Sequence, residues 1–240
     1  MTITRSLKMV GFTALVSIVT SAQSAATPPP QPPPFPTINV AFVLERNATL
    51  IDFAGPWQVF RDVMLTKNSA FFDLEKDDVK DIHWPFNLYV VSEKRELITT
   101  DSGMRIMADY SYRDAPTPEI IVVPAEDRES PARDEWLKKA SQDAKLTMSV
   151  CTGAYILAKD GLLDGKEATT HHAFQDDFEQ AFPKVHMKRG VRFVENGSTA
   201  TAGGLTSGID LALRIVKNYF GLSIAQAEAT YLEYKGTDWR

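Results

Sequence analysis

The chain has a single cysteine among its 240 residues, and this scarcity limits both what can hold the fold together and what can react. One cysteine cannot form a disulfide within the chain, so the fold must depend on a hydrophobic core. Cysteine, histidine and acidic residues nowhere gather at the spacing of a metal site, which predicts a protein without a bound metal. The lone thiol is either a buried apolar side chain or a reactive group.

The sequence also lacks a long apolar segment and an excess of basic residues. The apolar run at residues 9–19 is shorter than the roughly 20 residues that a membrane-spanning helix needs. The 31 acidic residues outnumber the 26 basic ones, and the resulting net charge of −5 disfavours a nucleic-acid partner. We therefore expect a protein that has no membrane anchor and binds no nucleic acid.

The first 36 residues divide into two segments that are expected to lie outside the fold. Residues 1–25 combine Arg5 and Lys8 with the apolar run and a stretch of small residues, which is typical of a secretory signal peptide. Residues 26–36 are rich in proline and predict a stiff polyproline spacer. Residues 37–240 are then expected to form one periplasmic or secreted domain.

Short apolar segments alternate with helical patterns along residues 37–240. Strands are predicted at residues 38–44, 87–92, 119–123, 145–150, near 168, and at 191–194 and 198–202. Helices are predicted at about residues 53–65, 136–142, 152–159, 172–182, 206–219 and 223–231. This alternation indicates an α/β fold with a mostly parallel sheet covered on both faces, in which reacting groups gather beyond the carboxyl ends of the strands.

Cys151 lies between a predicted strand and a predicted helix, with the small residues Ser149 and Gly153 two positions away on either side. This is the layout of a nucleophile elbow, a strained turn that presents a reactive side chain. The N-terminus of the following helix favours the thiolate, so we expect a lowered pKa for the thiol. The backbone N–H of Thr152 is placed to stabilise an oxyanion. The context favours a nucleophile over a structural cysteine.

Two further side chains are candidates for proton transfer at the same edge of the sheet. His171 follows the short strand near residue 168, but a lone histidine is often a cap or core residue, and the adjacent His172 is an equal candidate. Asp52 follows the first strand. Its spacing alone favours an N-cap of the next helix, and the alternative is a partly desolvated carboxyl that exchanges a proton with the thiol.

Three groups of residues together resemble the ThiJ/PfpI superfamily over about residues 38–234. They are Asp52-Phe53-Ala54-Gly55-Pro56-Trp57; Val150-Cys151-Thr152-Gly153-Ala154 with Gly161-Leu162-Leu163-Asp164-Gly165 and Ala168-Thr169-Thr170-His171; and Thr201-Ala202-Gly203-Gly204-Leu205-Thr206-Ser207-Gly208-Ile209-Asp210. The resemblance implies a flavodoxin-like three-layer sandwich, the fold of class I glutamine amidotransferases.

Within the superfamily, the Cys-Thr pair, the Asp-x-x-Gly-Pro turn and the Ala-Gly-Gly segment are most similar to the isonitrile hydratase branch. By that resemblance Cys151 adds to the isonitrile carbon, Asp52 is the acid/base partner, Thr152 is a polar helper, and water then gives an N-substituted formamide. The resemblance implies a small-molecule substrate, no cofactor and a homodimer. His171 remains a further candidate for the catalytic base.

The loop after the third predicted strand departs from the family pattern. It is usually Pro-Gly-Gly, and here it is Pro124-Ala125-Glu126, whose alanine resists positive φ and whose glutamate adds a carboxylate. We expect Ala125, Glu126, Gly153 and Gly55 to line the oxyanion and substrate pocket. Two alternatives to the hydratase stay open: an amidase or glyoxalase-like enzyme, and a non-catalytic thiol sensor or small-molecule-binding protein.

Overall fold

The computed structural model describes residues 37–67, 70–73, 75–127 and 129–240. The expected signal peptide and the proline-rich spacer lie outside these residues, so both stay predictions. In the described part of the chain, no helix combines the length and the apolar character that crossing a membrane requires.

A sheet of seven strands runs through the centre of the domain. In spatial order its strands are β10 (Phe193–Asn196), β11 (Thr199–Ala202), β7 (Leu146–Val150), β6 (Ile120–Val123), β1 (Ile38–Val43), β2 (Phe86–Ser92) and β5 (Tyr110–Ser111). All neighbours pair in parallel except β10 with β11. Two smaller ladders pair β3 (Leu97–Thr99) with β4 (Arg105–Met107) and β8 (Glu167–Ala168) with β9 (His186–Met187).

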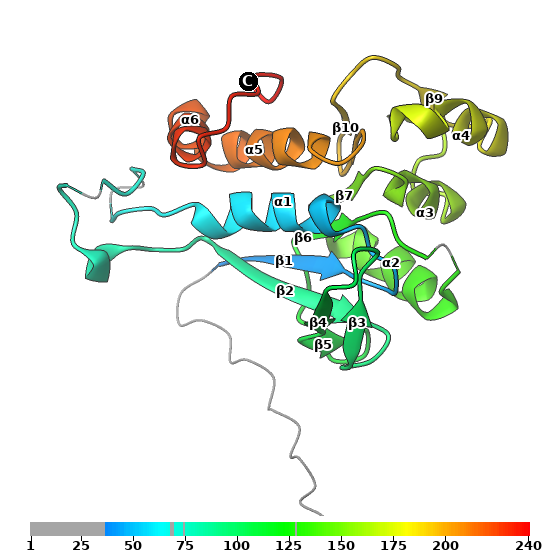
Figure 1. Ribbon diagram of the computed structural model, residues 1–240, viewed down its shortest axis with the longest axis horizontal. Coiled ribbons are helices and arrows are strands. Elements are labelled where there is room, and N and C mark those ends of the chain that lie inside the picture. The colour runs from blue at the N-terminus through cyan, green and yellow to red at the C-terminus, as the bar shows by residue number, and fades with distance from the viewer. Residues whose placement is uncertain (1–36, 68–69, 74, 128) are drawn as a thin grey trace, which may run out of the picture.

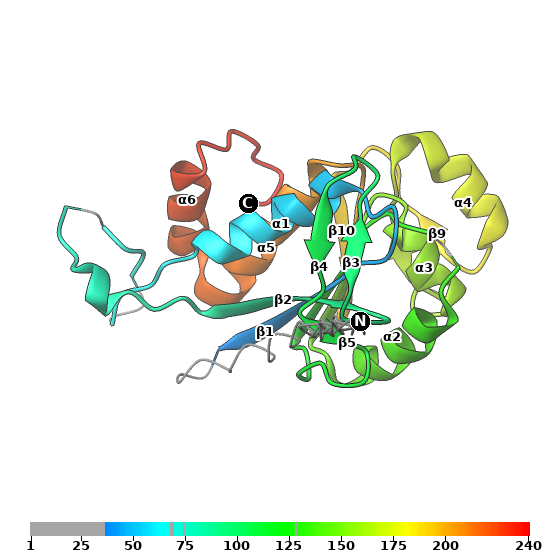
Figure 2. The same ribbon diagram turned by 60° about the horizontal axis from the view of Figure 1, so that its bottom comes forward.

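Helices cover both faces of this sheet (Figure 1 and Figure 2). One face carries α1 (Leu50–Asp62), α5 (Ser207–Phe220) and α6 (Leu222–Tyr231), and the other carries α2 (Pro131–Asp143), α3 (Gly153–Lys159) and α4 (Gln175–Ala181). Two short 3₁₀ turns, η1 (Val79–Asp81) and η2 (His172–Phe174), lie in the connections.

Successive residues of β1 divide between two cores, as expected for a strand buried on both faces. Val40 and Phe42 pack on the side of α1, α5 and α6, whereas Ala41 and Val43 pack on the side of α2, α3 and α4. The predicted α/β sandwich with a mostly parallel sheet is therefore confirmed.

The first helix differs from its prediction at its N-terminus. It begins at Leu50 rather than near Phe53, and Thr49 occupies the N-cap position, so the interpretation of Asp52 as the cap is wrong. Partners distant in sequence stabilise this start. The N–H of Leu50 donates to Asp101 Oδ1 (3.2 Å), and the N–H of Thr49 donates to the carbonyl of Ala125 (2.7 Å). Because these contacts are tertiary, no local capping pattern reveals them.

Glu228, on α6, is a fully buried acid whose two carboxyl oxygens have no hydrogen-bond partner among the described residues. Burial, with a smaller contribution from Asp62, raises its pKa from 4.5 to about 8. The native state therefore retains this proton between those two values. The contribution of the protonated Glu228 to the free energy of unfolding is fully present below pH 4.5 and is lost as the pH rises through about 8.

We expect Glu228→Gln to remove this part of the pH dependence of stability, because glutamine fills the same volume and carries no charge. At pH 9 the variant should be more stable than the native protein by roughly 2 kcal/mol or more, and at pH 4 the two should be nearly equal. Urea unfolding at the two pH values measures the difference. An equal difference at both pH values would show that Glu228 does not titrate.

Candidate active site

Four neighbouring parallel strands end at one edge of the sheet, and each is followed by a residue of the candidate site. In spatial order β11 leads to Leu205, β7 to Cys151, β6 to Ala125 and β1 to Asp52. Parallel strands present their carboxyl ends on the same side. The topology thus brings together residues that are far apart in the sequence.

The backbone of Cys151 is held in a strained conformation by hydrogen bonds on both sides. Its φ is +58°, in the left-handed region that non-glycine residues seldom adopt. Its N–H donates to the carbonyl of Gly203 (2.8 Å), and its carbonyl accepts from Thr170 Oγ1 (2.8 Å). The expected strand, turn and helix are present as β7, Cys151 and α3. This is the geometry of a nucleophile elbow.

Gly153 permits the close packing of this turn. A Cβ at this position would lie 2.3 Å from the carbonyl oxygen of Val123 and 2.7 Å from that of Pro124. These are backbone atoms at the end of β6, so they cannot move aside cheaply. Gly153 therefore acts as the small residue that the elbow requires, and its contacts are with the scaffold.

Asp52 lies in the first turn of α1 with its side chain fully buried. Its Oδ2 accepts the N–H of Ala125 (3.1 Å), whereas Oδ1 makes no well-formed hydrogen bond with any described residue. Burial, with the charge of Asp101, raises its pKa from 3.8 to about 7. The N–H groups of Ala125 and Leu205 and the nearby thiol of Cys151 oppose that rise. Near neutral pH this carboxyl can both accept and donate a proton.

The thiol of Cys151 departs from the prediction of an acidic cysteine. Burial and then the negative charge of Asp52 raise its pKa to about 11, while the N–H groups of Thr152 and Leu205 oppose the shift. The prediction of a lowered pKa is wrong because it included the helix terminus and omitted desolvation and a neighbouring carboxylate. A thiolate therefore forms near neutral pH when the thiol passes its proton to Asp52.

His171 contacts residues of its own loop and, across the cleft, Gly204, where a Cβ would lie 2.1 Å from its Cδ2. Its Nδ1 accepts the N–H of Ala173 (3.2 Å), which caps η2, and its ring stacks on that of His172 with centroids 4.4 Å apart. Burial, then the charge of His172, lowers its pKa. These contacts correspond to the capping interpretation. The side chain that reaches the nucleophile from this loop is that of Thr170, which the sequence interpretation did not select.

Like Gly153, two other expected pocket residues, Glu126 and Gly55, contact the scaffold. The carboxylate of Glu126 is buried against Arg133 (3.1 Å) and accepts the N–H of Glu45 (2.7 Å). Gly55 faces α5, where a Cβ would lie 2.9 Å from Ile209 Cγ1. The carboxylate of Glu126 is therefore occupied by other partners, and Gly55 allows two helices to pack closely.

Backbone N–H groups from two loops stabilise negative charge on the sulfur of Cys151. Those of Thr152 and Leu205 both favour its charged form. Ala125 was expected to line the oxyanion and substrate pocket, and its N–H donates to Asp52. Leu205 has φ +53° and was not selected from the sequence, because a backbone donor leaves no trace in the residue type. The only signal was the preceding pair Gly203-Gly204, which indicates a tight turn.

A cleft of about 490 Å³ lies against these loops, and its lining includes Thr170, His171, Arg192, Gly203 and Leu205 but neither Cys151 nor Asp52. Clefts of this size accept small molecules. Among the residues that the structure describes, no group of three or more histidine, cysteine or acidic side chains could hold a metal ion.

The profile of the DJ-1/PfpI family matches residues 38–218 of the chain. Isonitrile hydratase of Pseudomonas putida is 27% identical over 202 residues, which cover 82% of this chain and 78% of that protein. Two HTH-type transcriptional regulators of Pseudomonas aeruginosa are also similar. CdhR is 26% identical over 58% of this chain and 43% of its own length, and GbdR is 24% identical over 82% and 51%. The chain spans about half the length of these regulators.

Solved structures share the fold. A THiJ/PfpI family protein from Pseudomonas syringae superposes with a TM-score of 0.68 at 22% identity, over 84% of this chain and 76% of that one. Drosophila melanogaster DJ-1beta gives a TM-score of 0.66 at 18% identity, over 83% of this chain and 100% of that one. These likenesses concern the architecture alone.

Proposed function

This chain belongs to the DJ-1/PfpI family, and from that premise we propose that it is an enzyme that hydrates isonitriles with Cys151 as its nucleophile. The observation that carries the proposal is the buried pair of Cys151 and Asp52. It combines a soft nucleophile with a carboxyl whose pKa is raised to about 7 by burial. The similarity to an isonitrile hydratase over most of both chains supports the substrate class.

The proposed reaction has two stages. Asp52 takes the thiol proton as Sγ bonds to the terminal carbon of the isonitrile, and it returns that proton to the same carbon, which gives a thioimidate R–N=CH–S. Water then adds to this carbon and protonates the nitrogen. The C–S bond breaks, the hydroxyl proton returns to the thiol through Asp52, and the N-substituted formamide R–NH–CHO leaves. The net change is the addition of one water.

The surrounding backbone contributes to the first stage. The N–H groups of Thr152 and Leu205 stabilise negative charge on sulfur as the proton leaves. The N–H of Ala125 holds Asp52 Oδ2, which leaves Oδ1 free to exchange the proton. The raised thiol pKa disfavours a resting thiolate, so deprotonation and addition are coupled.

A panel of isonitriles, amides and dicarbonyls tests this proposal, with the native protein compared with Cys151→Ala. The expected result is consumption of one or more isonitriles and release of the matching N-formamide, identified by mass spectrometry, with the native protein alone. Turnover of amides or dicarbonyls without isonitrile turnover would assign the site to the amidase or glyoxalase-like class instead.

We expect kcat/KM to rise with pH up to about 7 and then to level off. The reason is that Asp52 must be charged to accept the thiol proton, and burial raises its pKa to about 7. Below that value kcat/KM should fall about tenfold per pH unit. Initial rates from pH 5 to 9 measure the profile. A profile that falls above pH 7 would mean that Asp52 acts in its protonated form in the first step.

A second candidate is a binding protein that uses the same site without turnover. Its support is the raised thiol pKa together with the similarity to transcriptional regulators, in which a related domain forms part of a longer chain. Saturable binding of an isonitrile or amide to Cys151→Ala, with no turnover by the native protein, would favour it.

We also propose that the mature domain is exported to the periplasm or the medium and forms a homodimer. The support for export is the N-terminal pattern of charge, apolar run and small residues. Mass spectrometry of exported protein tests this, with a new N-terminus expected between Ala22 and Thr27. The absence of nucleic-acid binding stays a prediction, and a DNA-binding titration at low salt tests it.

A further inference from the structure

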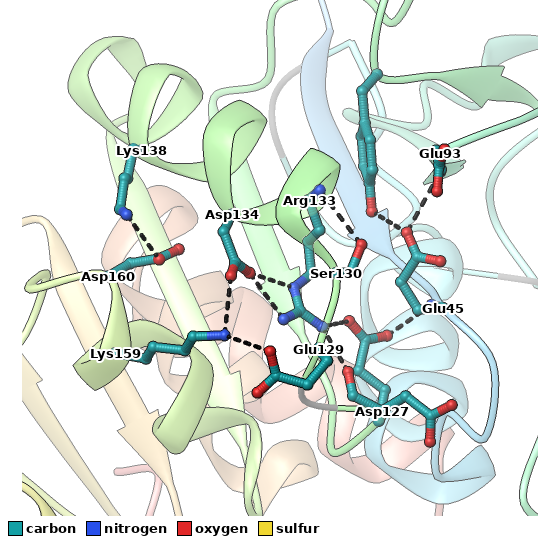
Figure 3. Close-up of polar contacts among 12 residues, drawn as sticks. Glu45, Glu93, Asp127, Glu129, Ser130, Arg133, Asp134, Lys138, Lys159 and Asp160 are labelled. Atoms are coloured by element: carbon teal, nitrogen blue, oxygen red, sulfur yellow. Dashed lines mark hydrogen bonds and ion pairs between the residues drawn. The ribbon is translucent and has the colours of Figure 1, made fainter.

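The loop that follows β6 ends in a buried polar network (Figure 3). At its centre is Arg133 of α2, whose side chain is fully buried. One guanidinium nitrogen, Nη1, donates to the carboxylate of Glu126 (3.1 Å) and to the carbonyl of Asp127 (2.7 Å). Nε and Nη2 donate to Asp134 (3.1 and 2.8 Å). Arg133 thus holds two successive residues of the loop to α2.

Glu126 connects the same loop to the end of β1. Its Oε2 accepts the N–H of Glu45 (2.7 Å), while its Oε1 faces Arg133. Glu45 in turn accepts the hydroxyl of Tyr112 (2.5 Å) and the N–H of Glu93 (3.3 Å). Figure 3 shows the contact between Glu45 and Glu93. Glu126 therefore connects the loop after β6 to the end of β1 and to α2.

Ala125, the residue before Glu126, contacts the site rather than α2. The N–H of Ala125 donates to Asp52 Oδ2 (3.1 Å), and its carbonyl accepts the N–H of Thr49 (2.7 Å). Ala125 therefore faces the N-terminus of α1 while Glu126 faces α2. The peptide unit that the two residues share carries the carbonyl of Ala125, so a backbone movement that released Glu126 from Arg133 would disturb the bond of that carbonyl with Thr49. Through the Cα of Ala125 the same movement would shift the N–H that donates to Asp52.

Stability alone is a weak explanation for this ion pair. Burying a guanidinium and a carboxylate costs desolvation energy that their attraction often fails to recover, and apolar residues of equal volume serve as well. What an ion pair with several hydrogen bonds provides is a single geometry. The feature of the site that depends on such geometry is the hydrogen bond from the N–H of Ala125 to Asp52 Oδ2.

We propose that Arg133 and Glu126 are positioning residues that fix the Ala125 loop so that its N–H holds the proton-exchanging carboxyl of Asp52. The inference rests on the proposed function for the role of Asp52. The groups that face Asp52 from neighbouring elements are the thiol of Cys151, the carboxylate of Asp101 and the N–H groups of Ala125 and Leu205. Of these, the Ala125 N–H is the largest influence that favours the charged carboxylate, and it is the one that the ion pair controls.

The test is the double variant Arg133→Met with Glu126→Gln, which removes both charges and keeps the side-chain volumes similar. Carbon-13 NMR of protein labelled at aspartate carboxyls reports the titration of Asp52 directly, with its signal assigned by its loss in Asp52→Asn. We expect the midpoint to move upward by about one pH unit, because a hydrogen bond to the charged form is weakened. Turnover at pH 7 should fall severalfold and recover at pH 9.

The matched control is Lys138→Met, which breaks an ion pair of the same helix with Asp160 (3.2 Å) at a distance from the loop (Figure 3). It should lower the melting temperature without moving the midpoint of Asp52. An unchanged midpoint in a folded double variant would overturn the positioning role, whatever its melting temperature. If the double variant does not fold, Arg133→Lys keeps the charge but not the forked geometry, and the same criterion applies.

The titration needs no substrate, so it separates this inference from the proposed function. A shifted midpoint in a protein that turns over no isonitrile would support the positioning role and refute the hydratase. Isonitrile turnover with an unshifted midpoint of Asp52 would support the hydratase and refute the positioning role.

Discussion

Asp52→Asn is expected to reduce isonitrile turnover by about a hundredfold or more and, at the same time, to make Cys151 more acidic. Asparagine keeps the size of the side chain and can still accept the N–H of Ala125. Asparagine carries no negative charge, and after burial the charge of Asp52 is the largest cause of the raised pKa of Cys151. It also lacks the proton that the reaction passes between sulfur and carbon.

Two measurements on the same preparation check this prediction. Steady-state rates give the loss of turnover, and the rate of iodoacetamide labelling against pH gives the midpoint of the thiol, because Cys151 is the only cysteine. Asp101→Asn is the control, since Asp101 influences Asp52 but is not among the causes of the thiol shift. Retained turnover would remove Asp52 from the mechanism, and an unmoved midpoint would show that its charge does not reach the sulfur.

Gly153→Ala should abolish turnover and destabilise the fold by roughly 3 kcal/mol or more. The added methyl group would lie 2.3 Å from the carbonyl oxygen of Val123, so either α3 or the end of β6 must move. Each movement displaces part of the site, because α3 follows Cys151 and β6 leads to Ala125. Urea unfolding and the standard turnover assay measure the two effects.

Gly161→Ala separates the effect of space from that of backbone conformation. Gly161 has φ +77°, and a Cβ there would meet nothing within 4 Å. The substitution should cost only about 1 kcal/mol through its left-handed φ, with turnover nearly unchanged. Equal destabilisation by the two substitutions would show that crowding at Gly153 is not the cause.

The fold could be predicted from the sequence because its strands and helices are marked by their own residues. Runs such as Ile120–Val123 are apolar throughout and are followed by a proline, so they can be identified as buried strands without knowledge of their distant partners. The short strands β3, β4, β5 and β9 were missed. Each has only two or three residues, too few for a periodic pattern.

The site was predictable in part of its residues and less so in its electrostatics. Cys151 was selected because its small neighbours and the preceding strand leave a pattern in the sequence, whereas Asp52 received a catalytic role only through the resemblance to the family, since its spacing favoured a cap. The direction of the thiol shift was not found, since it depends on burial and on a carboxylate 99 positions away. The contacts of Glu126 could not be predicted either, because nothing in the sequence indicates that its partner Arg133 is buried.

The convergence of four segments on one thiol also bears on how the chain unfolds. Asp52, Ala125, Cys151 and Leu205 span most of the described chain, so they come together only when β1, β6, β7 and β11 are all paired. Cys151 is 7% exposed. Unfolding removes the burial and the neighbouring carboxylate that raise the thiol pKa, so the rate of its labelling at a fixed pH should rise in one step, at the denaturant concentration at which the whole domain opens. The nucleophile is in this sense a built-in probe of cooperativity.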